Sequence, residues 1–167
     1  MRLFQSVLGR AAMGLALLAG LTASAGSALA GGARFRSVVI DTSPLVAKGY
    51  PTYAQMVERA VAPSVAAAFA DSIDPSDPRG LRLVFRIYSV TLPLATGAAR
   101  ESENDFMQSE GLVVDARGRV VSVTPILSPV SSWTTPANLP PEVEDFRRVR
   151  ALGLHAAYWL KRELPAF

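Results

Sequence analysis

Few residues of this chain are of the types that carry catalysis or bind metal ions. It has no cysteine, and His155 is its only histidine. A general base needs a nucleophile and an orienting carboxylate beside it, and no G-x-S-x-G motif supplies a serine nucleophile. Zinc sites need several His or Cys ligands. We therefore predict no catalytic residue and no zinc site. A hydrolase that uses His155 is the weakest of three functional hypotheses.

Acidic residues recur with regular spacing in two places. Asp71, Asp74 and Asp77 could offer oxygen ligands to Ca²⁺. However, the EF-hand pattern is absent, and Pro75 and Pro78 indicate that these aspartates form turns. We predict no metal site there. The second series is Glu101, Glu103 and Asp105, which alternate along an expected strand. Charged side chains are typical of an exposed sheet edge, and we expect these three residues to lie on one.

Three side chains with binding chemistry share one face of an expected strand. In Leu81–Leu92, Leu83, Phe85 and Ile87 alternate with polar residues. Successive side chains of a strand point to opposite faces, so this alternation predicts one buried face and one open face. The open face would carry Arg82, Arg86 and Tyr88, which could receive an acidic partner or an anionic lipid headgroup. The alternative is an ordinary solvated sheet face.

Trp133 is a fourth candidate binding residue. It lies in Thr124–Pro141, a proline-rich segment that we expect to be an extended crossover outside the sheet. A large aromatic ring there either packs on the core of its own domain or anchors a partner. Neither this segment nor any other contains a glycine-rich phosphate loop, so no cofactor is predicted.

The first thirty residues have the features of a secretory signal. Arg2 and Arg10 precede an apolar stretch, Ala11–Leu21, and an A-x-A site ends at Ala30. We expect cleavage there, with residues 31–167 forming a single domain that has no membrane span. An uncleaved anchor is the alternative. The absence of a twin arginine favours the general secretory route. Without a cysteine there can be no bacterial lipoprotein anchor.

Charge and composition restrict the partners. The chain has 17 Lys and Arg against 14 Asp and Glu, but the signal holds two arginines and no acid. The mature chain is therefore close to neutral, and nucleic acid loses its electrostatic support as a partner. An exported domain without disulfides fits the bacterial periplasm better than a disulfide-rich extracellular setting.

Hydrophobic periodicity and turn residues after the signal predict the order β-α-β-β-β-α for the strands and helices. Pro51 and Thr52 open the first helix, Thr52 and Gln55 have capping-box spacing, and an expected kink at Pro63 bends the helix. Asp115–Gly118 is expected to close a hairpin. The expected strands are 34–41, 81–92, 104–115 and 119–127, and the second helix is 142–164.

This order predicts an α+β fold, a two-layer sandwich in which two helices cover one face of a mainly antiparallel sheet of about four strands. The first functional hypothesis is an exported, periplasmic or secreted, non-enzymatic binding or accessory module of the bacterial cell envelope. Its partner would be an envelope protein or an anionic lipid. The second is a small lipid or apolar-ligand carrier, with a cavity between the bent helix and the sheet.

Overall fold

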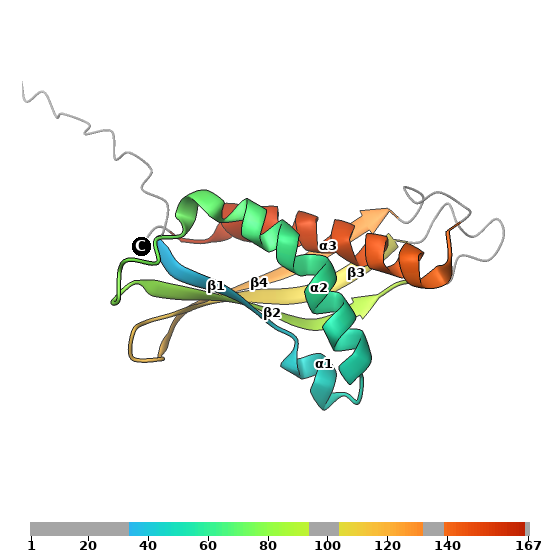
Figure 1. Ribbon diagram of the computed structural model, residues 1–167, viewed down its shortest axis with the longest axis horizontal. Helices are drawn as coiled ribbons and strands as arrows, with labels where there is room; N and C mark the ends of the chain where they lie inside the picture. Colours follow the sequence, from blue (N-terminus) through green and yellow to red (C-terminus); the bar gives the residue numbers. More distant parts are fainter. Residues whose placement is uncertain (1–33, 94–103, 132–138, 166–167) are drawn as a thin grey trace, which may run out of the picture.

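The chain is described by a computed structural model over residues 34–93, 104–131 and 139–165. Two long helices lie on the same side of one sheet (Figure 1). The elements in chain order are β1 (Phe35–Asp41), α1 (Ser43–Ala47), α2 (Pro51–Ala68), a 3₁₀ turn (Ala70–Ser72), β2 (Leu81–Thr91), β3 (Asn104–Val114), β4 (Val120–Ser131) and α3 (Pro141–Glu163).

The strands follow one another across the sheet in the order β1-β2-β3-β4. β1 and β2 are parallel, as the crossover through α2 requires, while β2–β3 and β3–β4 are antiparallel. β2 and β3 are thus the inner strands, and β1 and β4 form the two edges. The predicted two-layer α+β fold with a mainly antiparallel sheet is confirmed.

The core lies between the sheet and the two long helices. Leu83, Phe85 and Ile87 of β2 are fully buried on the helix side, as their alternation predicts. Opposite them, α2 presents the expected apolar stripe, and its small residues allow close approach. The buried residues of that stripe are Ala54, Val57, Ala60, Val61, Val65 and Ala68.

α2 differs from expectation at its start and is a single helix through Pro63, while the kink expected there stays a prediction. Tyr50 is the N-cap residue and no side chain caps the helix, so the predicted capping box of Thr52 and Gln55 is wrong. Pro51 occupies the first turn, where a missing N–H costs nothing. The helix continues through Pro63, which is exposed to solvent, and does not divide into two.

Two glycines let the layers meet. A Cβ added at Gly153 of α3 would lie 2.7 Å from Val61 Cγ2 of α2, and one added at Gly111 would overlap Leu160. The first contact joins the two helices, and the second joins α3 to the inner strand β3. Side chains at these positions would force the layers apart.

β4 corrects the boundary expected for the proline-rich segment. The strand runs to Ser131 and contains Pro125 and Pro129, which we had placed in an extended crossover. Prolines are tolerated because β4 is an edge strand, whose outward-facing backbone positions need no N–H donor. Those positions can no longer donate to an added strand, which protects this edge from pairing with another chain.

Two connections complete the fold. The β3–β4 hairpin closes as predicted: Gly118 has φ +80°, and Asp115 Oδ1 accepts hydrogen bonds from the backbone N–H groups of Arg117 and Arg119, both at 2.9 Å. The segment after β1 contains the short helix α1. Asp41 Oδ1 accepts a hydrogen bond from Ser43 N at 2.9 Å at its start.

Candidate functional site

The side of the sheet opposite α2 and α3, here called the open face, has an unusual distribution of apolar side chains. On β4, Ser122, Thr124 and Ser128 point toward the helix layer, whereas Val123 and Leu127 point away from it and are 52% and 63% exposed. A strand that covers a core normally shows the opposite pattern. The edge strand β4 is therefore more apolar on its uncovered side than on its covered side.

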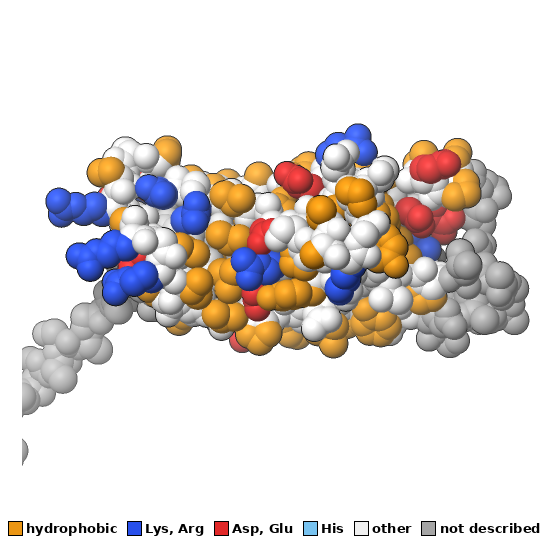
Figure 2. Space-filling view, turned by 90° about the horizontal axis from the view of Figure 1, so that it is seen from below, with side chains coloured by type: hydrophobic (Ala, Val, Ile, Leu, Met, Phe, Trp, Pro, Cys, Tyr) orange, Lys and Arg blue, Asp and Glu red, His pale blue; other side chains and the backbone are white. Residues whose placement is uncertain are grey.

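This exposed strip, here called the apolar row, continues onto the neighbouring strand. Phe106 of β3 pairs with Pro129 of β4 and is 38% exposed. Figure 2 looks onto the open face and shows hydrophobic side chains in a band beside a compact group of opposite charges. The apolar row consists of Phe106, Val123, Pro125, Leu127 and Pro129.

The compact charged group is centred on Arg86 of β2. Arg86 Nε donates to Asp41 Oδ2 at 2.7 Å, and its Nη1 lies 3.5 Å from Glu110 Oε1. Tyr88 donates its hydroxyl hydrogen to the same Glu110 oxygen. Strand register causes this arrangement, because Asp41 and Glu110 are the direct neighbours of Arg86 on β1 and β3.

The two carboxylates of this group outnumber its one guanidinium group. Burial alone would raise the pKa of Asp41, but hydrogen bonds from Ser43 and Arg86 outweigh it and hold that pKa below its usual value. The hydrogen bond to Glu110 raises the pKa of Tyr88. Arg86 thus faces two carboxylates, and its charge is largely compensated within the sheet.

The four predicted binding residues have different outcomes. Arg82, Arg86 and Tyr88 lie on the open face, as their alternation predicts. The structure does not bring Arg82 into the charged group: its Nε is buried and has no hydrogen-bond partner among the described residues. Trp133 lies outside the described residues. Their role in binding stays a prediction.

A shallow hollow separates Tyr88 from the apolar row. It has a volume of about 350 Å³ and lies over β3, between Tyr88 of β2 and Leu127 of β4. Glu110 and Gln108 are among its lining residues, so it combines acceptor groups with apolar walls.

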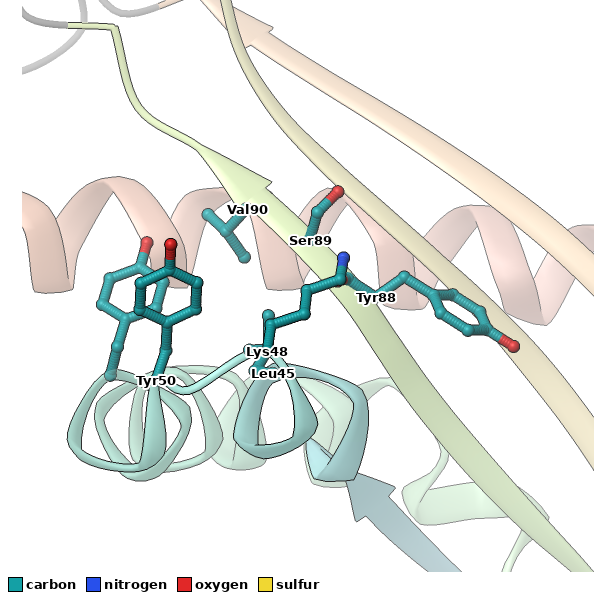
Figure 3. A pocket seen from close by; sticks show the side chains of 7 residues that line it. Leu45, Lys48, Tyr50, Tyr88, Ser89 and Val90 are labelled. Carbon is teal, nitrogen blue, oxygen red and sulfur yellow. The ribbon is translucent and has the colours of Figure 1, made fainter.

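A second hollow, the tyrosine groove, lies where α1 and the start of α2 meet the end of β2 (Figure 3). It encloses about 470 Å³. Lys48 reaches across to β2 and donates to the Tyr88 carbonyl oxygen at 2.8 Å. The Tyr88 ring points away from the groove (Figure 3). The lining residues are Leu45, Lys48, Tyr50, Tyr53, Tyr88, Ser89 and Val90.

His155 has a serine neighbour, yet their geometry favours a structural role. Its Nδ1 lies 2.8 Å from Ser128 Oγ, and that hydroxyl also donates to the Leu152 carbonyl oxygen at 3.3 Å. Ser128 is 1% exposed, so the contact ties α3 to β4 and presents no accessible nucleophile.

The acidic series Glu101, Glu103 and Asp105 contains one residue whose position the sequence pattern predicted wrongly. Asp105, expected on an exposed edge, is 1% exposed on the inner strand β3 and faces the helix layer, so that expectation is wrong. Arg148 of α3 donates through Nε to Asp105 Oδ2 at 3.0 Å and through Nη2 to Oδ1. Nη2 also donates to the Pro93 carbonyl oxygen at 3.0 Å. This pair holds the start of α3 onto the sheet.

The turn aspartates behave as their prolines indicate. Asp74 Oδ1 accepts from Ser76 N at 3.1 Å, and Asp77 Oδ1 accepts from Arg79 N at 2.9 Å. In the described ranges, no three or more His, Cys, Asp or Glu side chains gather as they would around a metal ion. Within the same ranges, no helix has the length and apolar character needed to cross a bilayer.

Comparisons with known proteins give no family. No family model and no curated protein matches the chain. One similar solved structure is the dodecamer of a PelC variant from Paraburkholderia phytofirmans, with 12% identity and a TM-score of 0.37 over 74% of this chain and 91% of that one. Another is a protein from Caulobacter crescentus CB15, provisionally described as a lipoprotein, with 17% identity and a TM-score of 0.37 over 82% and 97%. At these TM-scores neither likeness carries an argument.

Proposed function

We propose that this chain is an exported, non-enzymatic binding module of the bacterial cell envelope, and that it docks on a protein partner through the open face of its sheet. The observation that carries the proposal is the reversed polarity of β4: most of its apolar side chains point away from the core, and only Ile126 and Val130 among the apolar residues of 122–131 face it. The secretory signal predicted for residues 1–30 supports the compartment.

The partner would meet the face of the sheet and would not extend its edge. Pro125 and Pro129 remove backbone donors from the outer edge of β4, so strand addition there lacks part of its hydrogen-bond ladder. The apolar row can instead be covered by an apolar strip on the partner. Exposed apolar side chains grouped in this way are typical of protein interaction sites.

The charged group beside the apolar row would set orientation. Arg86 is already compensated by Asp41 and Glu110, so it offers a partner little free positive charge. Charged groups at the rim of an interface usually govern specificity and association rate more than affinity. The geometry thus favours an apolar protein surface over an anionic headgroup as the ligand of this face.

Site-specific photo-crosslinking in cells that export the protein tests this proposal. A photoreactive residue at Leu127 should give a discrete adduct, which the further substitution Val123→Asp should abolish. The same residue at Arg147, an exposed position on α3, is the matched control. Equal adducts from both positions, or none from Leu127, would remove the open face from consideration. An adduct with twice the mass of the chain would identify a second copy as the occupant and contradict a heterologous partner.

The tyrosine groove supports a second candidate, a carrier of a small apolar ligand. The cavity expected between α2 and the sheet does not carry it, because the side chains between those layers form the packed core. The groove's volume of about 470 Å³ falls within the range of small-molecule sites. Native mass spectrometry of residues 31–167 purified without detergent should then show a bound species that Val90→Asp removes. Only the unliganded mass, even after incubation with lipid mixtures, would end this candidate.

A further inference from the structure

Arginines gather at one end of the sheet, although their positions are far apart in the sequence. β1 and β2 are parallel, so both begin at this end, and the antiparallel hairpin between β3 and β4 turns at the same end. Figure 2 shows several Lys and Arg side chains gathered there. This arginine end consists of Arg34, Arg36, Arg79, Arg82, Arg117 and Arg119.

The acids at this end do not cancel the positive charge. Three aspartates in the same turns, Asp74, Asp77 and Asp115, stand against the six arginines of this end. Arg119 pairs with Asp115 at 2.8 Å but remains 69% exposed at its side chain. Arg34 is 76% exposed, and its nearest carboxylate oxygen is 4.0 Å away. A near-neutral chain therefore presents a locally cationic end.

Exposed apolar side chains lie among these arginines. Val120 and Val121, immediately after Arg119 at the hairpin, are 54% and 48% exposed, and Ile73 beside Arg34 is 36% exposed. Guanidinium groups interleaved with exposed aliphatic side chains are typical of surfaces that settle into the headgroup region of a bilayer. A soluble polyanion would use the arginines but would gain nothing from the valines.

The chain's course points to the same partner. Arg34, the first described residue, lies at the arginine end, and the apolar stretch Ala11–Leu21 precedes it in the sequence. Before the cleavage expected at Ala30, a secretory signal would hold that stretch in the membrane, and the arginine end would be the part of the domain nearest to it. We propose that the arginine end, which adjoins the open face at Arg82, is a docking surface for an anionic lipid bilayer.

Vesicle flotation tests the assignment with residues 31–167, which contain every described helix and strand and lack the apolar stretch. Wild type should float with phosphatidylcholine vesicles that contain about 30% phosphatidylglycerol and remain unbound with pure phosphatidylcholine. About 1 M NaCl, which shortens the Debye length to about 3 Å, should release it.

Charge-reversal variants separate a local surface from a net-charge effect. Arg79→Glu/Arg117→Glu should weaken vesicle partitioning by about tenfold or more, while Arg147→Glu/Arg150→Glu, the same charge change on the exposed face of α3, should weaken it by less than about threefold. Circular dichroism of both variants confirms that they fold. Equal losses in the two variants, or equal binding to both vesicle types, would overturn the proposal.

A valine variant separates a bilayer from a soluble polyanion. Val120→Ser should weaken binding to the anionic vesicles and leave binding to dextran sulfate unchanged, because only the bilayer has an apolar phase to receive the side chain. Wild-type protein that binds dextran sulfate but neither vesicle type would make this end a polysaccharide site, and the membrane assignment would be wrong.

Discussion

The two faces of the sheet each carry an arginine–carboxylate pair, and the pairs differ in what surrounds them. Arg148 and Asp105 lie between the sheet and α3, with side chains 7% and 2% exposed. Arg86 and Asp41 lie on the open face, with side chains 35% and 21% exposed. The covered pair must satisfy every donor locally, as its contact with the Pro93 carbonyl oxygen shows. The open pair is partly hydrated, so substituting one of its residues should cost little stability.

Breaking the covered pair should have the largest effect on stability. Asp105→Asn leaves the Arg148 charge buried without its counter-ion, so we expect the free energy of unfolding to fall by about 3–5 kcal/mol. Urea denaturation followed by circular dichroism measures this change. The double variant Asp105→Leu/Arg148→Met, which removes both charges, should recover much of the loss. A loss below about 1 kcal/mol for Asp105→Asn would show that the pair is not buried as described.

The pH dependence of stability offers a second test of burial on the helix side, through the phenol of Tyr53. Burial, reinforced by the nearby Asp145 carboxylate, raises the pKa of Tyr53 from 10.0 to about 12. The unfolded chain then ionises this phenol at lower pH than the folded chain. Its contribution to stability is complete below pH 10 and is lost as pH rises toward about 12. Between these pH values wild type should lose about 1–2 kcal/mol more stability than Tyr53→Phe does.

A spectroscopic titration supplies the control for that prediction. Absorbance of the phenolate, compared between wild type and Tyr53→Phe, should show one tyrosine titrating near pH 12 only in wild type. If the two proteins lose stability in parallel above pH 10, the Tyr53 hydroxyl is not shielded by the helix layer.

Among these substitutions, that of Arg86 on the open face should have the smallest effect on the free energy of unfolding. Arg86→Met keeps most of the side chain's length but removes its bonds to Asp41 and Glu110, and partly exposed ion pairs contribute about 1 kcal/mol or less. The same urea denaturation checks it. A loss as large as that of Asp105→Asn would contradict the difference between the faces.

The sequence predicted the layers well because their signals are local. The period-2 alternation at Leu83, Phe85 and Ile87 and the helical stripe through Val57 and Val61 each determine a buried face without reference to the rest of the chain. The Asp115–Gly118 hairpin is similarly local. Boundaries at prolines were less predictable, because the tolerance of Pro125 and Pro129 depends on β4 being an edge strand.

The candidate site was predicted only in part, because its chemistry depends on pairing across strands. Alternation correctly placed Arg86 and Tyr88 on the open face, yet only register reveals that Asp41 and Glu110 flank Arg86. Asp105 was assigned to an exposed edge because no local pattern links it to Arg148, 43 residues away. One signal was available in the sequence: Val121, Val123 and Leu127 share the alternation parity of β4, opposite to Ser122, Thr124 and Ser128.

Two adjacent residues of β4 test the central claim most directly, because Ile126 faces the helix layer and Leu127 faces away from it. Each is replaced by aspartate, and the free energy of unfolding is measured by urea denaturation. The reversed polarity of β4 predicts a loss of about 3 kcal/mol or more for Ile126→Asp and within about 0.5 kcal/mol for Leu127→Asp. Equal losses, or a larger loss at Leu127, would contradict an exposed apolar row and the binding surface inferred from it.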